Sequence, residues 1–252
     1  MSGNRFFVPL DVFNQAETFF PPAISKQITS VLRLKSGQMV TILDNNGHCR
    51  SVELLDIDSK QVTGQPGEIS PATGEPKVNL TLCVALSQRE KFEWILQKGC
   101  ELGVRHFIPV VTSRSLVQDT RGREEKMDRW NKILQEASEQ CGRGLIPSIN
   151  NPQKLDDFLK QNQGRRGYIL HEKVKGSYFA ASLQNSLISG EKDWLLLVGP
   201  EGGFSEDEVN LAEQAGLQPV SLGPRILRME TAVLAACAVF MAAAGELGSM
   251  DL

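Results

Sequence analysis

Histidine and cysteine, which often build metal sites and activated nucleophiles, are scarce in this chain. The 252 residues include three histidines and five cysteines, and the cysteines are odd in number, scattered and without a C-x-x-C pair. The metalloprotease motif H-E-x-x-H and the nucleophile-elbow motif G-x-S-x-G are also missing. The sequence therefore predicts free thiols in a reducing compartment, with neither a disulfide framework nor a metal site.

Apolar stretches long enough to cross a membrane are missing as well. The one candidate, residues 232–244, is uncharged but shorter than the roughly 17 to 25 residues that a spanning helix needs. We interpret it as a buried helix. The first residues, MSGNRFFVPLDVF, carry no signal-peptide pattern, so we expect a cytoplasmic protein.

The first 72 residues are predicted to form a small β-rich domain. Asn45-Asn46-Gly47 lies between two strand-like runs and is typical of a hairpin turn. A single helix is expected within PPAISKQITSVLRLKSG, with prolines at its start and Gly37 at its end. Residues 63–76 are rich in Gly, Pro, Ser and Thr, which predicts a domain boundary there.

Residues 73–252 alternate between strand-like and helix-like patterns, which predicts an α/β domain with a mainly parallel sheet covered on both faces. The expected strands are residues 78–86, 106–112, 167–172, 194–199 and 218–223, and the expected helices are Glu90–Leu102, Glu124–Cys141, Gln153–Gln161, Glu206–Ala215 and Ala232–Gly245.

A glycine-rich motif, LLLVGPEGGFSEDEV, follows one of these strands at residues 195–209. Its glycines permit close approach of a ligand or a tight joint, and Ser205 with Glu208 predicts a capping box at the next helix. Loops at the carboxyl ends of such strands commonly bind ligands. No Walker lysine or G-x-G-x-x-G pattern occurs, and the surrounding residues are acidic, which suits a positively charged ligand better than a phosphate.

A second motif, SLGPRILRMETAVLAACA, covers residues 221–238. Its strand breaks at Gly223-Pro224, and Thr231 is the expected cap of an alanine-rich helix. The alanines permit close approach of a flat ring or of another helix, so binding and dense packing both remain open.

Together the two motifs closely resemble the paired loops of the SPOUT (trefoil-knot) methyltransferases, specifically the bacterial 16S ribosomal RNA (uracil-N3) methyltransferase family RsmE. Further landmarks stand in family order along nearly the whole chain: RFFVP, VLRLKSG, REKFEWILQKGCELGV, TSRS and EASEQCGRGLIPSI. The resemblance implies a PUA-like RNA-binding β-barrel over residues 1–72 and a knotted SPOUT domain over residues 73–252. It also implies a homodimer, which would cover the apolar helix at residues 232–244, although a central helix within one domain would bury it equally well.

The resemblance implies S-adenosylmethionine as the cofactor and a uridine of 16S rRNA, within the small ribosomal subunit, as the methyl acceptor. The implied cofactor-binding residues are Leu170, His171, Glu172, Val198, Gly199, Pro200, Glu201, Gly202, Gly203, Leu222, Gly223, Ile226, Leu227, Arg228, Thr231 and Ala232.

Arginine is expected to stabilise negative charge on the uracil oxygens, with Arg228 the first choice and Arg143 the second. Glu230 is expected either to assist proton removal or only to favour the helix start, and no general base is assigned. The expected RNA contacts are Arg5, Arg33, Lys35, Arg89, Lys91, Lys98, Arg114 and Arg143. A silent RNA-binding homologue, or a related enzyme acting on transfer RNA or on a ribose hydroxyl, is the alternative.

Overall fold

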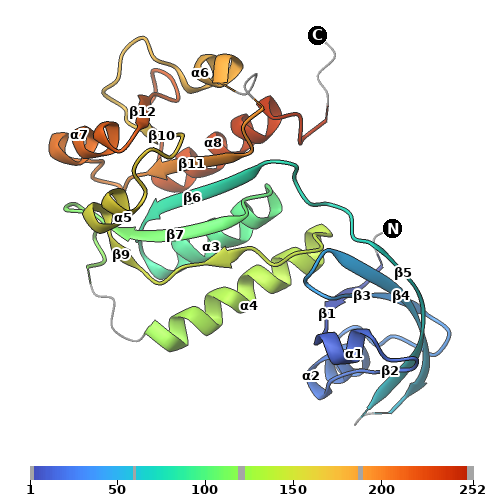
Figure 1. Ribbon diagram of the computed structural model, residues 1–252. Helices are drawn as coiled ribbons and strands as arrows, with labels where there is room; N and C mark the ends of the chain where they lie inside the picture. Colours follow the sequence, from blue (N-terminus) through green and yellow to red (C-terminus); the bar gives the residue numbers. More distant parts are fainter. Residues whose placement is uncertain (1–2, 59–60, 119–122, 187–189, 249–252) are drawn as a thin grey trace. The chain divides into compact units, whose positions relative to one another are not determined.

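A computed structural model describes residues 3–58, 61–118, 123–186 and 190–248, and the chain divides into two compact units (Figure 1). The first unit combines Met1–Glu75 with Gln135–Ile146, and the second combines Pro76–Leu134 with Pro147–Leu252. The predicted boundary after residue 72 did not include the return of residues 135–146 to the first unit.

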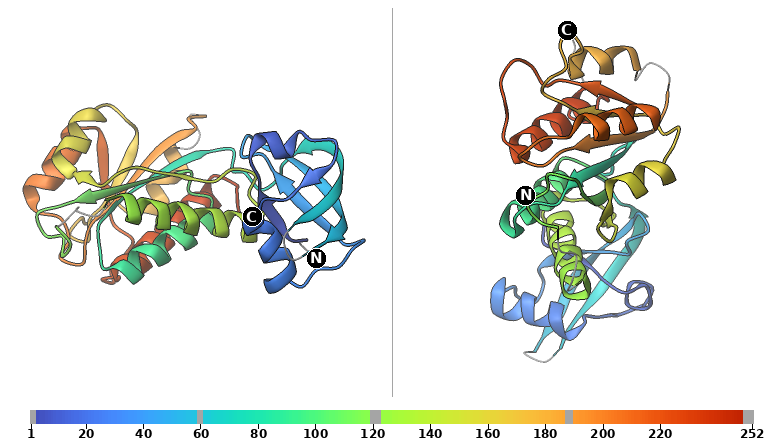
Figure 2. Two further views of the ribbon diagram at one scale, coloured as in Figure 1. Left: turned by 90° about the horizontal axis from the view of Figure 1, so that it is seen from below. Right: turned by 90° about the vertical axis from the view of Figure 1, so that its left-hand side faces the viewer.

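The first unit is a curled five-stranded sheet in the order β1-β3-β4-β5-β2. Its strands are β1 (Arg5–Phe7), β2 (Thr18–Phe19), β3 (Met39–Leu43), β4 (His48–Ile57) and β5 (Val62–Pro71). Only the β1–β3 pair is parallel, and β4 and β5 run antiparallel side by side (Figures 1 and 2). The apolar core of this unit includes Phe6, Phe20, Ile42 and Leu54.

The Gly- and Pro-rich stretch in which we expect a domain boundary, residues 63–76, lies largely within strand β5. The strand carries Gly64 and Pro66, which disfavour a regular strand, but its pairing with β4 shifts register twice. A side chain at position 64 would meet Val52 Cγ1 at 2.5 Å, so a glycine is needed where the two strands approach closely. Gly64 and Pro66, residues typical of turns, are therefore part of an irregular strand.

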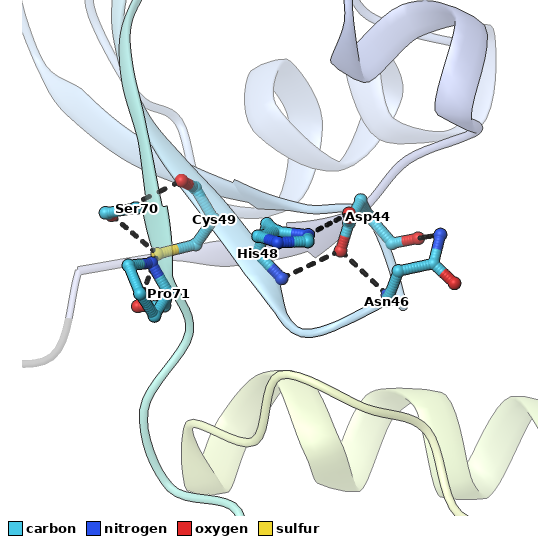
Figure 3. Close-up of polar contacts among 6 residues, drawn as sticks. All are labelled: Asp44, Asn46, His48, Cys49, Ser70 and Pro71. Atoms are coloured by element: carbon cyan, nitrogen blue, oxygen red, sulfur yellow. Dashed lines mark hydrogen bonds and ion pairs between the residues drawn. The ribbon is translucent and has the colours of Figure 1, made fainter.

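The expected hairpin turn is confirmed between β3 and β4, where Asn45 and Gly47 both have positive φ. Figure 3 shows how the Asp44 carboxylate holds it: one oxygen accepts hydrogen bonds from the backbone N–H groups of Asn46 (2.7 Å) and His48 (2.9 Å), and the other lies 2.9 Å from His48 Nδ1. Beside it, Cys49 Sγ lies 3.3 Å from the hydroxyl oxygen of Ser70. Side-chain hydrogen bonds therefore add to the backbone hydrogen bond from Asp44 N–H to the His48 carbonyl, at 3.3 Å, that closes the turn.

The helical part of this unit is shorter than expected. It comprises α1 (Leu10–Phe13), α2 (Pro22–Lys26) and a π-helical turn, Gln27–Val31. The expected continuation to Gly37 is wrong because Arg33 adopts a left-handed backbone, φ 52°. Leu32 and Leu34, on either side of it, both pack against the core, and this requires the chain to turn there.

The second unit has a parallel sheet in the order β12-β10-β11-β6-β7-β8, with β9 also paired to β7. The strands are β6 (Asn79–Ala85), β7 (His106–Val111), β8 (Ser148–Ile149), β9 (Gln153–Lys154), β10 (Gly167–Leu170), β11 (Asp193–Val198) and β12 (Leu217–Val220). The helices are α3 (Arg89–Glu101), α5 (Leu155–Gln161), α6 (Phe179–Ser186), α7 (Glu206–Gln214) and α8 (Met229–Ala243). Helix α4 (Arg123–Cys141) begins in this unit, and its residues from Gln135 onward belong to the first unit. The predicted parallel α/β arrangement is confirmed, although α6 was not predicted and residues 153–154 are strand.

Side chains that alternate along the strands pack on opposite faces of this sheet. Ile169 and Leu195 join an apolar cluster with α5 and α7. Tyr168 and Trp194 stack at 6.0 Å on the other face, where Phe179 of α6 and Phe240 of α8 contact them. No helix within the described ranges is long and apolar enough to cross a membrane.

Candidate cofactor site

Three loops of the second unit meet at the carboxyl ends of the adjacent strands β10, β11 and β12, because parallel strands end at the same edge of a sheet. They enclose a cavity of about 460 Å³. Its lining residues are Leu170, His171, Glu172, Val198, Gly199, Pro200, Glu201, Gly202, Gly203, Phe204, Ser221, Leu222, Gly223, Arg225, Ile226, Leu227, Arg228, Met229 and Ala232.

The cavity gathers fifteen of the sixteen residues predicted to bind a cofactor, all except Thr231. Helix α8 begins at Met229 and has Arg228 at its N-cap, so the prediction that Thr231 caps this helix is wrong. The prediction also missed four lining residues, Phe204, Ser221, Arg225 and Met229, and the sequence carried no signal that the Phe204 ring lies against Gly199.

The glycines of the loop after β11 have separate structural reasons. A side chain at position 199 would meet the Phe204 ring at 2.9 Å, and Phe204 is 2% exposed. Gly203 has φ 67°, and a side chain there would lie 3.3 Å from Glu172 Oε1. The glycine-rich loop is thus both a tight strand-to-helix joint and one wall of the cavity.

A buried polar atom in the loop after β10 lacks a hydrogen-bond partner in the part of the chain that the structure describes. Within the described residues, His171 Nδ1 has no hydrogen-bond partner, although Glu172 Oε2 lies 3.7 Å away. Buried polar groups in folded proteins nearly always have a partner, so this nitrogen can receive a polar atom of a ligand. The loop after β12 adds apolar side chains, among them Ile226 at 86% exposure, together with Arg225 and Arg228. Such a cavity suits a ligand that is partly flat and apolar and partly polar.

Charged groups cluster where the loop faces α3. Lys91 Nζ lies 2.7 Å from Glu201 Oε1, and this carboxylate raises the pKa of Lys91, with Glu230 adding to the effect and Arg228 opposing it. Burial raises the pKa of Glu201, but the hydrogen bond from Lys91, a backbone hydrogen bond and the charge of Lys91 together outweigh it, and the net pKa is lowered. Glu230 Oε2 is buried without a hydrogen-bond partner in the described structure. The predicted catalytic pair Arg228 and Glu230 therefore lies in one electrostatic cluster with Lys91 and Glu201.

Arg143 is not part of this cluster. It lies in the first unit with 2% of its surface exposed, and its guanidinium forms a two-point contact with Glu75, Nη2 to Oε2 at 2.9 Å and Nε to Oε1 at 3.2 Å. Glu75 Oε1 also accepts a hydrogen bond from the backbone N–H of Leu145, at 3.0 Å. Arg143 thus makes a buried structural contact, and its roles in catalysis and RNA contact stay predictions.

The other predicted RNA contacts divide into two groups. Arg33 and Lys35 are exposed on the first unit. The remaining side chains already have protein partners: Arg5 with the Gly142 carbonyl, Arg89 with Glu93, Lys91 with Glu201, Lys98 with Glu101, and Arg114 with the carbonyls of Gly202 and Phe204.

Comparison with known proteins identifies the family. The family model described as an RNA methyltransferase domain matches residues 74–241. The chain belongs to this RNA methyltransferase family. The ribosomal RNA small subunit methyltransferase E of Bacillus subtilis is 33% identical to it over 82% of each chain.

Two solved structures are similar to this chain over nearly its whole length. The ribosomal RNA small subunit methyltransferase E of Neisseria gonorrhoeae, bound to S-adenosylmethionine, has 27% identity and a TM-score of 0.84, with 95% of this chain and 97% of that chain covered. A Legionella pneumophila protein, also solved with that cofactor, has 31% identity and a TM-score of 0.85, with 96% and 98% covered.

Proposed function

We propose that this protein transfers a methyl group from S-adenosylmethionine to N3 of a specific uridine in 16S rRNA of the small ribosomal subunit. The single observation that carries the proposal is the cavity formed by three glycine-bearing or apolar loops at one edge of the parallel sheet. Its family relatives are small-subunit rRNA methyltransferases, and two of its structural neighbours bind the same cofactor.

The residues present fit this cofactor. The apolar side chains of Ile226 and Leu227 suit an adenine ring, and the unpartnered His171 Nδ1 suits a polar group of the ligand. Two carboxylates that line the cavity, Glu172 and Glu201, favour a cationic ligand. The sulfonium of the cofactor supplies an activated methyl group, so the protein has to align the two reactants and favour the anionic form of the base.

Arg228 is the residue that we propose favours the anionic form of the base. It is exposed at the cavity, and it precedes α8 in an extended conformation that leaves its side chain outside the helix. A guanidinium there stabilises the negative charge that develops on the uracil oxygens when N3 loses its proton. Glu230, two residues further along the chain, has a buried carboxylate oxygen without a hydrogen-bond partner in the described structure, and this oxygen is free to accept a hydrogen bond or that proton.

We also propose that the first unit is a PUA-like barrel and that the second unit contains a trefoil knot. The curled sheet of the first unit supports a PUA-like RNA-binding barrel, with Arg33 and Lys35 as phosphate contacts. The adjacency of β10, β11 and β12, with their three loops around one cavity, supports the trefoil knot. The small ribosomal subunit as substrate accords with the expected cytoplasmic location.

A homodimer through α8 is the proposed assembly. The helix carries apolar side chains all round, and Leu234, Ala235, Ala238 and Val239 keep partial exposure in the single chain. A second copy would remove that apolar surface from water. Light scattering on the purified protein tests this, since a monomer at micromolar concentration contradicts it.

The decisive experiment supplies labelled S-adenosylmethionine and the protein to small ribosomal subunits from cells that lack it, and then maps the labelled nucleoside. We expect N3-methyluridine in 16S rRNA. Label on a ribose or on transfer RNA supports the related-enzyme alternative, and no label on any RNA supports the silent homologue. Arg228→Ala is expected to lose turnover with an unchanged melting temperature, and Arg228→Lys to recover only part of it because lysine lacks the planar two-point donor.

A further inference from the structure

The loop after β7, residues 112–118, contacts the glycine-rich wall of the cavity. Arg114 Nη1 donates hydrogen bonds to the carbonyl oxygens of Gly202 at 3.0 Å and Phe204 at 3.2 Å. These two carbonyls flank Gly203, which has the left-handed backbone. One guanidinium therefore holds the wall on both sides of its most unusual residue.

A second contact reaches the same wall from the neighbouring residue. Glu208 Oε1 accepts a hydrogen bond from the backbone N–H of Ser113 at 2.7 Å, while its Oε2 accepts one from Ser205 N–H at 2.8 Å. Glu208 is only 6% exposed. The carboxylate of the capping box thus also joins the β7 loop to the end of the wall.

The β7 loop is itself held in place. The hydroxyl of Ser115 accepts a hydrogen bond from Thr112 N–H at 3.1 Å, and Gln118 Nε2 donates to the carbonyls of Thr112 and Ser115 at 2.9 and 2.8 Å. Thr112 and Ser115 are buried. Arg114 therefore projects from a fixed support onto a segment whose glycines have little conformational preference of their own.

We propose that Arg114 is a positioning residue for cofactor binding, which holds the Gly199–Phe204 wall in its binding shape, rather than a residue that contacts RNA phosphate. This inference rests on the proposed function, since it takes the wall to be part of the cofactor site. Preorganisation of a flexible loop strengthens binding because the ordering cost is met before the ligand arrives. RNA affinity gains nothing from it.

The test uses the full-length variants Arg114→Gln and Arg114→Lys, with Lys160→Gln as a matched control that removes an exposed charge at the end of α5. The first measurement is hydrogen exchange of residues 199–205 in protein free of cofactor. We expect faster exchange in Arg114→Gln, a smaller change in Arg114→Lys and none in Lys160→Gln.

The second measurement is calorimetric titration with S-adenosylmethionine, alongside filter binding of 16S rRNA. Arg114→Gln is expected to bind the cofactor about three to tenfold more weakly, which corresponds to about 0.7 to 1.4 kcal/mol of lost preorganisation, with unchanged RNA affinity and a small fall in melting temperature from the two lost hydrogen bonds. Arg114→Lys is expected to regain part of the cofactor affinity.

Unchanged exchange in Arg114→Gln overturns the inference, as does faster exchange without loss of cofactor affinity. A loss confined to RNA affinity overturns it too, and restores Arg114 as an RNA contact. If the unmodified protein binds no cofactor, the proposed function fails instead. The exchange comparison still decides whether Arg114 holds the wall.

Discussion

The buried contact between Arg143 and Glu75 predicts that Arg143→Met impairs stability and leaves chemistry intact. The substitution leaves the Glu75 carboxylate without its counter-charge at 17% side-chain exposure. Breaking a buried pair from one side costs about 3 to 5 kcal/mol, and the partial exposure of Glu75 places the loss near 3. In a chain of this length that corresponds to a fall in melting temperature of about 6 to 12 °C.

The matched variant is the double substitution Glu75→Gln with Arg143→Met. The amide oxygen of glutamine still accepts the N–H of Leu145, and no buried charge is left uncompensated, so this protein should melt above Arg143→Met alone. Melting is followed by circular dichroism, and methyl transfer is measured at 25 °C, where all variants are folded. An Arg143→Met protein with the normal melting temperature and no turnover would refute the structural role and return Arg143 to the chemistry.

Three further substitutions or conditions test other parts of the structure. Gly203→Ala places a side chain in a left-handed backbone 3.3 Å from Glu172 Oε1; we expect a stability loss of about 1 to 2 kcal/mol by denaturant titration and weaker cofactor binding by calorimetry. Ser205→Ala removes the N-cap of α7 and should cost about 1 kcal/mol, so an unchanged unfolding midpoint contradicts the capping box. Burial raises the pKa of Asp44, but hydrogen bonds from His48 and Asn46 outweigh it and leave the pKa below 3.8. Its contribution is therefore full above pH 3.8 and lost as the pH falls through the lower folded value, and Asp44→Asn should flatten stability against pH in that acidic range.

The sequence was sufficient for features whose cause is local. The capping box of Ser205 and Glu208 forms as predicted, and α3 and α7 begin or end within one residue of expectation. The hairpin at Asn45 also forms because its turn residues tolerate positive φ. Most of the cavity lining followed from the resemblance to a known family, except Phe204, Ser221, Arg225 and Met229.

Features that depend on distant segments were not predictable from the pattern. The composition around Gly64 indicates only a domain boundary, but its neighbours pair with β4 and form a strand. Arg143 carries the charge of a catalytic or RNA-binding residue, and its contact with Glu75, far away in the sequence, accounts for its burial. In both cases tertiary contacts outweigh local propensity.

The return of residues 135–146 to the first unit has a consequence for dissection of this protein. A cut after Glu75 would strip Arg143 of its counter-ion and Arg5 of its carbonyl partner at Gly142 in the same stroke. Each fragment would then keep one partner of each of these two interactions. Swapping the amino-terminal part with that of another protein accordingly means transplanting two stretches of chain, with the matching end of a helix carried along.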